Sequence, residues 1–186
     1  MAKTDLPTPE ELRKLLRYEP DTGKLFWRAR SVALFSSTGR RSANHACALW
    51  NSRFAGKEAF TADDGGGYKS GGIFCRLHRA HRVIWALHHD EWPTHEIDHI
   101  NGVKDDNRIV NLRDVSHIEN SRNTRRSSNN TSGHMGVGWN KARGKWEARI
   151  KVGRQIYLGL FDVFEDAVAA RKAAEIKYGF HENHGA

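Results

Sequence analysis

The sequence predicts an α+β protein built from two small modules. A strand–loop–strand–helix pattern occupies residues 97–120, and three short strands followed by one helix occupy residues 136–178. The chain has 186 residues, of which 38% are hydrophobic, a composition better suited to small compact modules than to one large core. We therefore expect a first domain over residues 1–124, a linker over 125–133 and a second domain over 134–186.

The charge of the chain is positive and unevenly distributed. The sequence has 30 Lys and Arg against 22 Asp and Glu, a formal charge of +8. Residues 61–120 have an excess of acids, whereas residues 121–157 contain nine basic side chains and one acid. An acidic centre followed by a basic block suits a divalent-cation site beside a phosphate backbone; an unevenly charged solvated surface is the alternative.

Two classes of protein are disfavoured by the apolar pattern. No apolar run approaches the ~20 residues of a membrane helix, and the first residues contain no apolar core of a signal peptide. We therefore expect a cytoplasmic protein with no membrane partner.

The N-terminal third predicts a helix and a strand. Pro9–Leu16 should be helical, because Thr8 can cap it and Pro9 suits its first position. Tyr18–Gly23 is typical of a turn and Lys24–Ala29 of a strand. Residues 31–55 show no period and are expected to be a loop or a variable insertion.

A glycine-rich stretch and a second helix lead into the centre of the chain. Asp63–Gly72 contains five glycines and should link two extended segments. His81–His88 predicts a helix with an apolar face formed by Val83, Ile84 and Leu87.

The central segment combines a turn with a helix start. Ile97–Ile100 predicts a short strand and Asn101–Gly102 a turn. Ile109–Val115 can return as a second strand. Ser116 followed by Glu119 fits a capping box, so a helix should start near His117 and carry Asn120 on its first turn.

Asp98, His99 and Asn120 supply the minimum set for cleaving a phosphodiester. Histidine can activate water near neutral pH. A carboxylate and an amide oxygen suit a hard cation that stabilises the charge on phosphate. Each residue alone is common in structural roles, so the interpretation depends on their order around the turn and the capping box.

This segment, together with EELRKLLRYEPDTGKLFWR and AHRVIW upstream, resembles the HNH or ββα-metal endonucleases of phages and introns. The resemblance implies a small ββα-metal nuclease core with an N-terminal β-rich extension. It implies that His99 is the general base, that Asp98 and Asn120 hold Mg²⁺ or Mn²⁺, and that Asn111 braces the loop between the strands. The substrate would be double-stranded DNA, nicked by a monomer of phage or mobile-element origin within a bacterial host cell.

Two further features of this region are compared with the family. His117 is a secondary candidate that either touches phosphate or the metal-bound water or only caps the helix. Many relatives carry cysteine pairs for a structural zinc, which this chain lacks, so no structural zinc is expected. The string Cys75, His78 and His81 has zinc-like spacing, but its basic neighbours favour a structural role.

The last fifty residues predict a three-stranded sheet with one basic face. In Lys145–Lys151, Trp146, Ala148 and Ile150 should face one way and the charged residues the other. In Gln155–Leu160, Ile156, Leu158 and Leu160 should share a face. The segment GVGWN at 136–140 is a third strand, and a helix over Phe164–Tyr178 should cover the apolar side.

This module resembles the plant APETALA/ethylene-response-factor DNA-binding domain, on Gly136-Val137, Gly144-Lys145-Trp146, Ala148-Arg149-Ile150 and Leu158-Gly159. The resemblance implies that the open face of the antiparallel sheet enters the major groove. Met135 and Gly138 stand where plant members carry base-reading arginines, so the plant target is not carried over. The expected DNA contacts are Arg122, Arg125 and Arg126 before the sheet, Lys141 and Arg143 in its turn, and Lys145, Arg149, Lys151, Arg154 and Tyr157 on its strands.

Two other functions compete with the nuclease interpretation. One is a DNA-binding regulator with a catalytically silent HNH fold. The other is a binder of structured RNA, which depends on charge alone and would prefer A-form or single-stranded nucleic acid.

Overall fold

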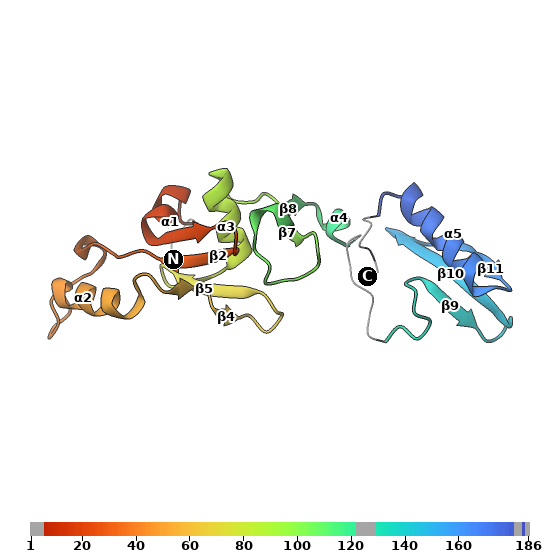
Figure 1. Cartoon of the computed structure of the whole chain (residues 1–186), viewed down its shortest axis with the longest axis horizontal. Helices are drawn as coiled ribbons and strands as arrows, with labels where there is room; N and C mark the ends of the chain where they lie inside the picture. The colour runs from red at the N-terminus through yellow and green to blue at the C-terminus, as the bar shows by residue number, and fades with distance from the viewer. Residues whose placement is uncertain (1–5, 122–128, 181–183, 185–186) are drawn as a thin grey trace. The chain divides into compact units, whose positions relative to one another are not determined.

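The computed structural model describes residues 6–121, 129–180 and 184, and it confirms a mixed α+β fold of several small sheets (Figure 1). The chain divides into two compact units, one formed by residues 1–99 with 103–114 and the other by 100–102 with 115–186. Each unit has its own hydrophobic cluster. In the described part of the chain, no helix is long and apolar enough to cross a membrane.

The first helix forms where the sequence predicts it. α1 (Pro9–Leu15) is capped by Thr8, whose hydroxyl accepts a hydrogen bond from the Glu11 N–H while the Glu11 carboxylate accepts one from the Thr8 N–H. This reciprocal capping box satisfies two amide groups that a helix start leaves without partners. Leu16, expected in the helix, instead begins the first strand.

The first sheet has the order β1-β2-β3. β1 (Leu16–Glu19) pairs antiparallel with β2 (Lys24–Trp27), and β2 pairs with β3 (Glu58–Ala59). The expected turn is therefore shorter than predicted, because Tyr18 and Glu19 belong to the ladder.

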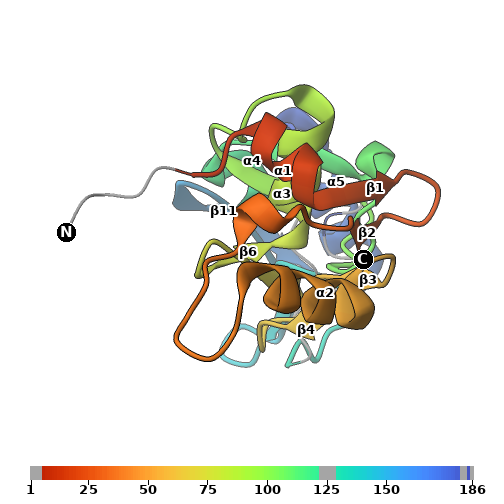
Figure 2. The same cartoon turned by 90° about the vertical axis from the view of Figure 1, so that its left-hand side faces the viewer.

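Residues 31–55 are not the predicted loop. They contain a short 3-10 helix, η1 (Val32–Leu34), and α2 (Ala43–Phe54), which is capped by Ser42. None of the residues of α2 is buried, so the helix has no continuous apolar stripe that sequence periodicity could reveal. Figure 2 shows α2 as an arm below α1 in the first unit.

The glycine-rich stretch forms a small second sheet, β4-β5-β6, from β4 (Ala62–Asp63), β5 (Lys69–Ile73) and β6 (Arg76–Arg79). Gly71 lies within β5 rather than in a link, and a Cβ there would meet the Phe60 ring at 2.8 Å. β6 runs directly into α3 (Ala80–His89), which confirms the second helix. The core of the unit gathers α1, β2, β5 and α3, with Leu12, Leu16, Leu25, Ile73, Val83 and Ile84 almost fully buried.

The central pattern occurs in the predicted order. β7 (Glu96–His99) and β8 (Leu112–Val115) form a two-stranded sheet, and α4 (His117–Ser121) follows. The start of the expected second strand is instead a 3-10 turn, η2 (Ile109–Asn111). The capping box of α4 is present, because the Glu119 carboxylate accepts from the Ser116 N–H and the Ser116 hydroxyl accepts from the Glu119 N–H.

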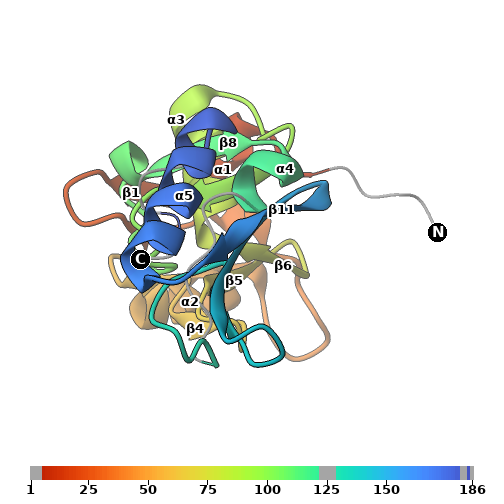
Figure 3. The same cartoon turned by 90° about the vertical axis from the view of Figure 1, so that its right-hand side faces the viewer.

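The C-terminal sheet has the order β11-β10-β9, all antiparallel. Its strands are β9 (Val137–Asn140), β10 (Lys145–Val152) and β11 (Arg154–Phe161). α5 (Phe164–Lys177) runs across one face of this sheet (Figures 1 and 3). Ala148 and Ala167 are fully buried between sheet and helix, so small residues set the close approach of the two layers.

One expectation for β11 is wrong. The register runs from Ala148–Gly159 directly to Arg149–Tyr157, so Leu158 is an extra residue that forms a bulge. The bulge reverses the parity beyond it: Phe161 lies opposite Trp146 in the core, and Leu160 lies opposite Glu147 on the other face. Period-two reasoning placed Leu160 in the core because a bulge leaves no sign in the pattern.

The predicted linker is described only in part. Residues 125–128 lie outside the described residues. Asn130 and Ser132 form a hydrogen-bonded turn, in which the Asn130 amide and the Ser132 hydroxyl both donate to the His134 carbonyl.

Candidate functional site

Asp98 and His99 occupy the last two positions of β7 and are both buried. Only 8% of Asp98 and 3% of His99 is exposed. A buried carboxylate next to a buried imidazole is costly unless each finds polar partners, so their contacts define the site.

Arg113, a residue that the sequence analysis did not identify, is the partner of Asp98. From β8 it donates hydrogen bonds from Nε (2.9 Å) and Nη2 (2.6 Å) to the same carboxylate oxygen, Oδ2. A cation at this position competes with any metal ion for Asp98. The signal for it was present, since Arg113 lies on the strand that pairs with β7.

His99 is oriented by Asn107. The Asn107 amide oxygen lies 3.1 Å from His99 Nε2, and Asn107 is itself 3% exposed. With the amide oxygen as acceptor, Nε2 carries the hydrogen and the ring lone pair is on Nδ1. The neutral tautomer that can accept a proton is therefore selected by one buried amide.

Two aromatic rings enclose the His99 imidazole. Tyr68 lies 5.8 Å and His81 5.2 Å from it between ring centroids, and Tyr68 and His81 also contact each other. Burial lowers the pKa of His99, against the opposing effect of the Asn107 hydrogen bond. The ring is thus held in its neutral form, which is the form a general base requires.

His81 is the most perturbed group of this cluster. Burial, with the nearby His99, Arg79 and Arg82, lowers its pKa to about 3. Its Nδ1 has no hydrogen-bond partner among the described residues. Since Cys75 is exposed and His78 stacks near Trp92, the zinc-like string does not converge. No group of three His, Cys, Asp or Glu that could hold a metal occurs in the described part of the chain.

The loop that carries Asn107 is held from two sides. Asn111, the expected brace, donates from its side chain to the Asp106 carbonyl at 2.8 Å. The Tyr18 hydroxyl accepts from the Ile109 N–H at 2.9 Å. Gly23, in the β1–β2 turn, presses against the same loop: a Cβ there would lie 2.6 Å from the Arg108 nitrogen. The β1–β2 hairpin therefore holds the loop that carries Asn107 in position.

Asn120 and His117 both lie on α4, as predicted, and Asn120 donates its backbone N–H to the Ser116 carbonyl. The division of the chain assigns Asp98 and His99 to the first unit and α4 to the second. The joining of Asn120 to Asp98 around one metal ion stays a prediction. Because Asp98 and Asn120 would supply two oxygen ligands, a hard cation would take the remainder of its shell from water and phosphate.

The outer face of the C-terminal sheet is basic but contains one acid. Arg149, Lys151 and Tyr157 are exposed, and the register places them on the side of β10 away from α5. Arg149 pairs with Glu147 at 2.6 Å, and Lys145 pairs with Asp162. These contacts hold the two cations in place and reduce the net charge that the face presents.

The other predicted DNA contacts divide into three groups. Lys141 and Arg143 are exposed in the turn between β9 and β10. Arg154 lies opposite Val152, on the side of the sheet that carries Ile150, so the assignment of Arg154 to the open face is wrong. The chain bends at Gly153, so the alternation of side chains between the two faces does not continue from β10 into β11. Arg122, Arg125 and Arg126 lie outside the described residues.

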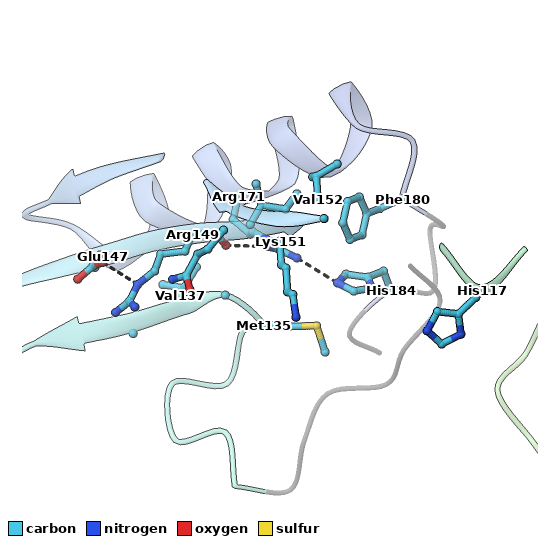
Figure 4. A pocket seen from close by; sticks show the side chains of 15 residues that line it. His117, Met135, Val137, Glu147, Arg149, Lys151, Val152, Arg171, Phe180 and His184 are labelled. Carbon is cyan, nitrogen blue, oxygen red and sulfur yellow. Dashed lines mark hydrogen bonds and ion pairs between the residues drawn. The ribbon is translucent and has the colours of Figure 1, made fainter. Parts of the chain in front are cut away.

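A hollow of about 930 Å³ opens at one edge of this sheet, with Met135, Lys151, Arg171 and Phe180 among its lining residues. Figure 4 shows Arg149 and Lys151 on the opposite side of β10 from α5. Arg171 comes from α5, is 3% exposed, and donates to the Arg149 carbonyl at 2.6 Å. The helix therefore anchors the backbone of the strand whose side chains form the basic face.

Comparison with known proteins identifies the central segment. Residues 78–122, which include Asp98, His99, Asn107 and Arg113, match the family model of the HNH endonucleases. This segment is therefore similar to an HNH endonuclease domain. Over 78 residues the chain is 34% identical to Protein 3.8 of Escherichia phage T7.

That similarity is partial on both sides. The matched segment is 41% of this chain and 64% of the phage protein. No solved structure matches the chain significantly.

Proposed function

We propose that the protein is a metal-dependent endonuclease that hydrolyses phosphodiester bonds in double-stranded DNA. The observation that carries the proposal is the buried His99 imidazole, held neutral by burial and in one tautomer by Asn107, next to a buried carboxylate within the matched HNH segment. A neutral imidazole, held in one orientation beside a carboxylate, is what proton abstraction from water requires.

In this mechanism His99 acts as general base through Nδ1 and accepts a proton from water. The water oxygen bonds to phosphorus as the bond from phosphorus to the 3′ oxygen breaks. The released 3′ oxygen takes a proton from solvent, which leaves 5′-phosphate and 3′-hydroxyl ends. Asp98 and Asn120 would hold the divalent ion, which neutralises charge on the phosphate and the leaving oxygen. Asn107 and Asn111 keep the base and its loop in position.

Finer features follow as parts of the same proposal. The C-terminal unit, with an open basic sheet face and one helix behind it, would grip DNA as an APETALA/ethylene-response-factor-type domain does. The single site per chain favours nicking by a monomer, with Mg²⁺ or Mn²⁺ as the ion. The similarity to a phage protein favours action inside a bacterial cell, in a phage or homing context.

The test is the conversion of supercoiled plasmid in Mg²⁺ or Mn²⁺ against EDTA. Wild type should give open-circular product only with metal, and His99→Ala should lose at least about 100-fold in rate. His88→Ala, at an exposed position in the last turn of α3, is the matched control and should cleave like wild type. Full metal-dependent cleavage by His99→Ala would overturn the mechanism.

One observation favours a second function, a DNA-binding regulator with a silent nuclease fold. Arg113 occupies the Asp98 carboxylate that a metal would need. The two functions separate in the plasmid assay: salt-sensitive DNA binding without cleavage at any divalent-ion concentration would favour the regulator.

A further inference from the structure

The charge of the first unit is segregated in a way that the HNH site does not explain. The sequence contains no Asp or Glu from residue 22 to residue 57, yet it has seven Lys and Arg there. We call residues 28–57 the α2 arm. It contains η1, α2 and the basic residues Arg28, Arg30, Arg40, Arg41, Arg53 and Lys57.

Seven cations of the first unit outside the arm are paired with carboxylates, whereas Lys69, Arg76, Arg82 and Lys104 have no ion pair among the described residues. Ion pairs there join Arg13 to Asp90, Lys14 to Glu10, Arg17 to Glu19, Lys24 to Glu58, Arg79 to Asp64, Arg108 to Asp106 and Arg113 to Asp98. In the described part of the chain, the six cations of the α2 arm have no carboxylate within ion-pair distance. Five of them are exposed, Arg30 being half-buried. Exposed cations without counter-charges raise the local positive potential, which attracts a polyanion.

The arm is rigidly attached despite having no buried residue on α2. The Asn51 amide clamps the Arg30 backbone, accepting from its N–H at 2.8 Å and donating to its carbonyl at 2.9 Å. Trp50 contacts Trp27 and Phe54, with ring centroids 5.8 and 5.2 Å apart. The contact of Trp50 with Trp27 joins the helix to β2, and the Asn51 hydrogen bonds join it to the preceding segment of the arm.

The Arg30 side chain is a cation of the arm that two aromatic rings hold in place. Its guanidinium lies 3.8 Å from the Trp50 ring and also near the Trp27 ring. Stacking on aromatic rings orients an arginine without neutralising it. Its Nε is buried with no hydrogen-bond partner among the described residues.

We propose that the α2 arm is a second DNA-contact surface, which binds the phosphate backbone of duplex DNA away from the cleaved bond. This inference rests on the proposed function, which supplies DNA as the polyanion. In the first unit, α2 lies at the end opposite β7 and β8 (Figure 1), so the arm touches a part of the duplex that the catalytic residues do not reach. The arm therefore contributes to affinity and to the length of DNA covered, and not to the chemical step.

The test measures DNA affinity as a function of salt for two variants with the same loss of charge. Arg40→Ala/Arg41→Ala removes two exposed cations from the arm. Lys14→Ala/Lys24→Ala removes two cations that are already ion-paired. Fluorescence anisotropy with a random-sequence duplex in EDTA, from low to high salt, gives the slope of log affinity against log salt concentration.

The arm variant should bind about one to two orders of magnitude more weakly at 0.1 M salt, with a slope smaller by about two. The paired-cation control should keep the wild-type slope. In a cleavage assay the arm variant should raise KM and leave kcat within about twofold of wild type.

The outcomes separate the inference from the proposed function. If wild type binds duplex but the arm variant has the wild-type slope and affinity, the inference is overturned and the nuclease proposal stands. If wild type does not bind duplex at all, the proposed function itself fails. Loss of binding to RNA or to vesicles of anionic phospholipid, with duplex binding unchanged, would also overturn the inference.

Discussion

Arg113 and Asp98 join the two strands of the candidate site through a single carboxylate oxygen, with the Arg113 nitrogens 2.9 and 2.6 Å from Asp98 Oδ2. The pair gives a buried carboxylate a cationic partner. It also means that a metal ion meets an arginine at the same residue. The stability of the protein and its response to metal are therefore coupled at Asp98.

Arg113→Ala tests this coupling. Without metal, we expect the free energy of unfolding to fall by about 2 kcal/mol, because a buried carboxylate loses two charge-assisted hydrogen bonds. Mg²⁺ should raise the melting temperature of the variant more than that of wild type, since the cation replaces the lost charge. Lys14→Ala, which breaks an exposed pair on α1, should respond to Mg²⁺ as wild type does. If Arg113→Ala is insensitive to divalent ions in thermal unfolding, Asp98 is not a metal ligand.

The Asn107–His99 hydrogen bond predicts a loss in rate without a loss in DNA affinity. Asn107→Leu removes the acceptor that selects the tautomer, and kcat for plasmid nicking should fall about 10- to 100-fold. Asn107→Asp keeps an acceptor at the same place and should retain more activity than the leucine variant. Equal rates for wild type and Asn107→Leu at saturating DNA would show that Asn107 does not orient the base.

His81 predicts a pH dependence of stability. Its folded pKa, about 3, lies below the ordinary value of 6.5, so the unfolded chain binds more protons between these two values. Stability contributed by the neutral ring is complete above pH 6.5 and is lost as the pH falls towards 3, by up to about 1.4 kcal/mol per pH unit. Urea unfolding of His81→Phe should show a flatter profile in this window. An unchanged slope in the variant, measured beside His45→Phe on exposed α2, would contradict the prediction.

A side chain at position 136 is expected to destabilise the C-terminal unit alone. It has a φ of +73°, and a Cβ there would lie 2.4 Å from the Arg149 carbonyl oxygen and 2.7 Å from Arg171 Nη1. Gly136→Ala should therefore cost about 3 kcal/mol or more, from backbone strain and overpacking together. Gly144→Ala is a matched control, because its φ is also positive but nothing lies within 4 Å.

Hydrogen exchange resolves where the Gly136→Ala effect falls. Protection should drop in β9, β10 and β11 and stay at the wild-type level in α1 and α3. Equal destabilisation by Gly136→Ala and Gly144→Ala would mean that backbone strain alone, and not the contact with Arg171, limits position 136.

Local sequence signals predicted the elements that have a regular period or a cap. The cap at Thr8 and the capping box at Ser116 marked two helix starts correctly, and alternation in Lys145–Lys151 identified the buried side of β10. α2 was missed because a helix held by a few aromatic contacts and an Asn51 clamp needs no apolar stripe. The bulge at Leu158 was missed because one inserted residue changes the facing of a strand without changing its composition.

The sequence predicted the candidate reactive groups of the site but not the residues that surround them. Asp98 and His99 stand next to each other in the sequence, and both are buried in β7. Arg113, Asn107, His81 and Tyr68 reach them from four other segments. Contacts of this kind depend on strand pairing and on the packing of β6 and α3, which no local pattern reports.

Gly23 limits where the first unit can be truncated. It lies against the backbone of Asn107 and Arg108, far along the chain from the matched segment that begins at residue 78. The segment that matches the family model is thus shorter than the segment that holds His99 and Asn107 in position. Transplanting residues 78–122 into another scaffold would carry Asp98, His99 and Asn107 but leave behind the β1–β2 hairpin that packs on their loop. A transferable version of this site therefore has to begin before β1.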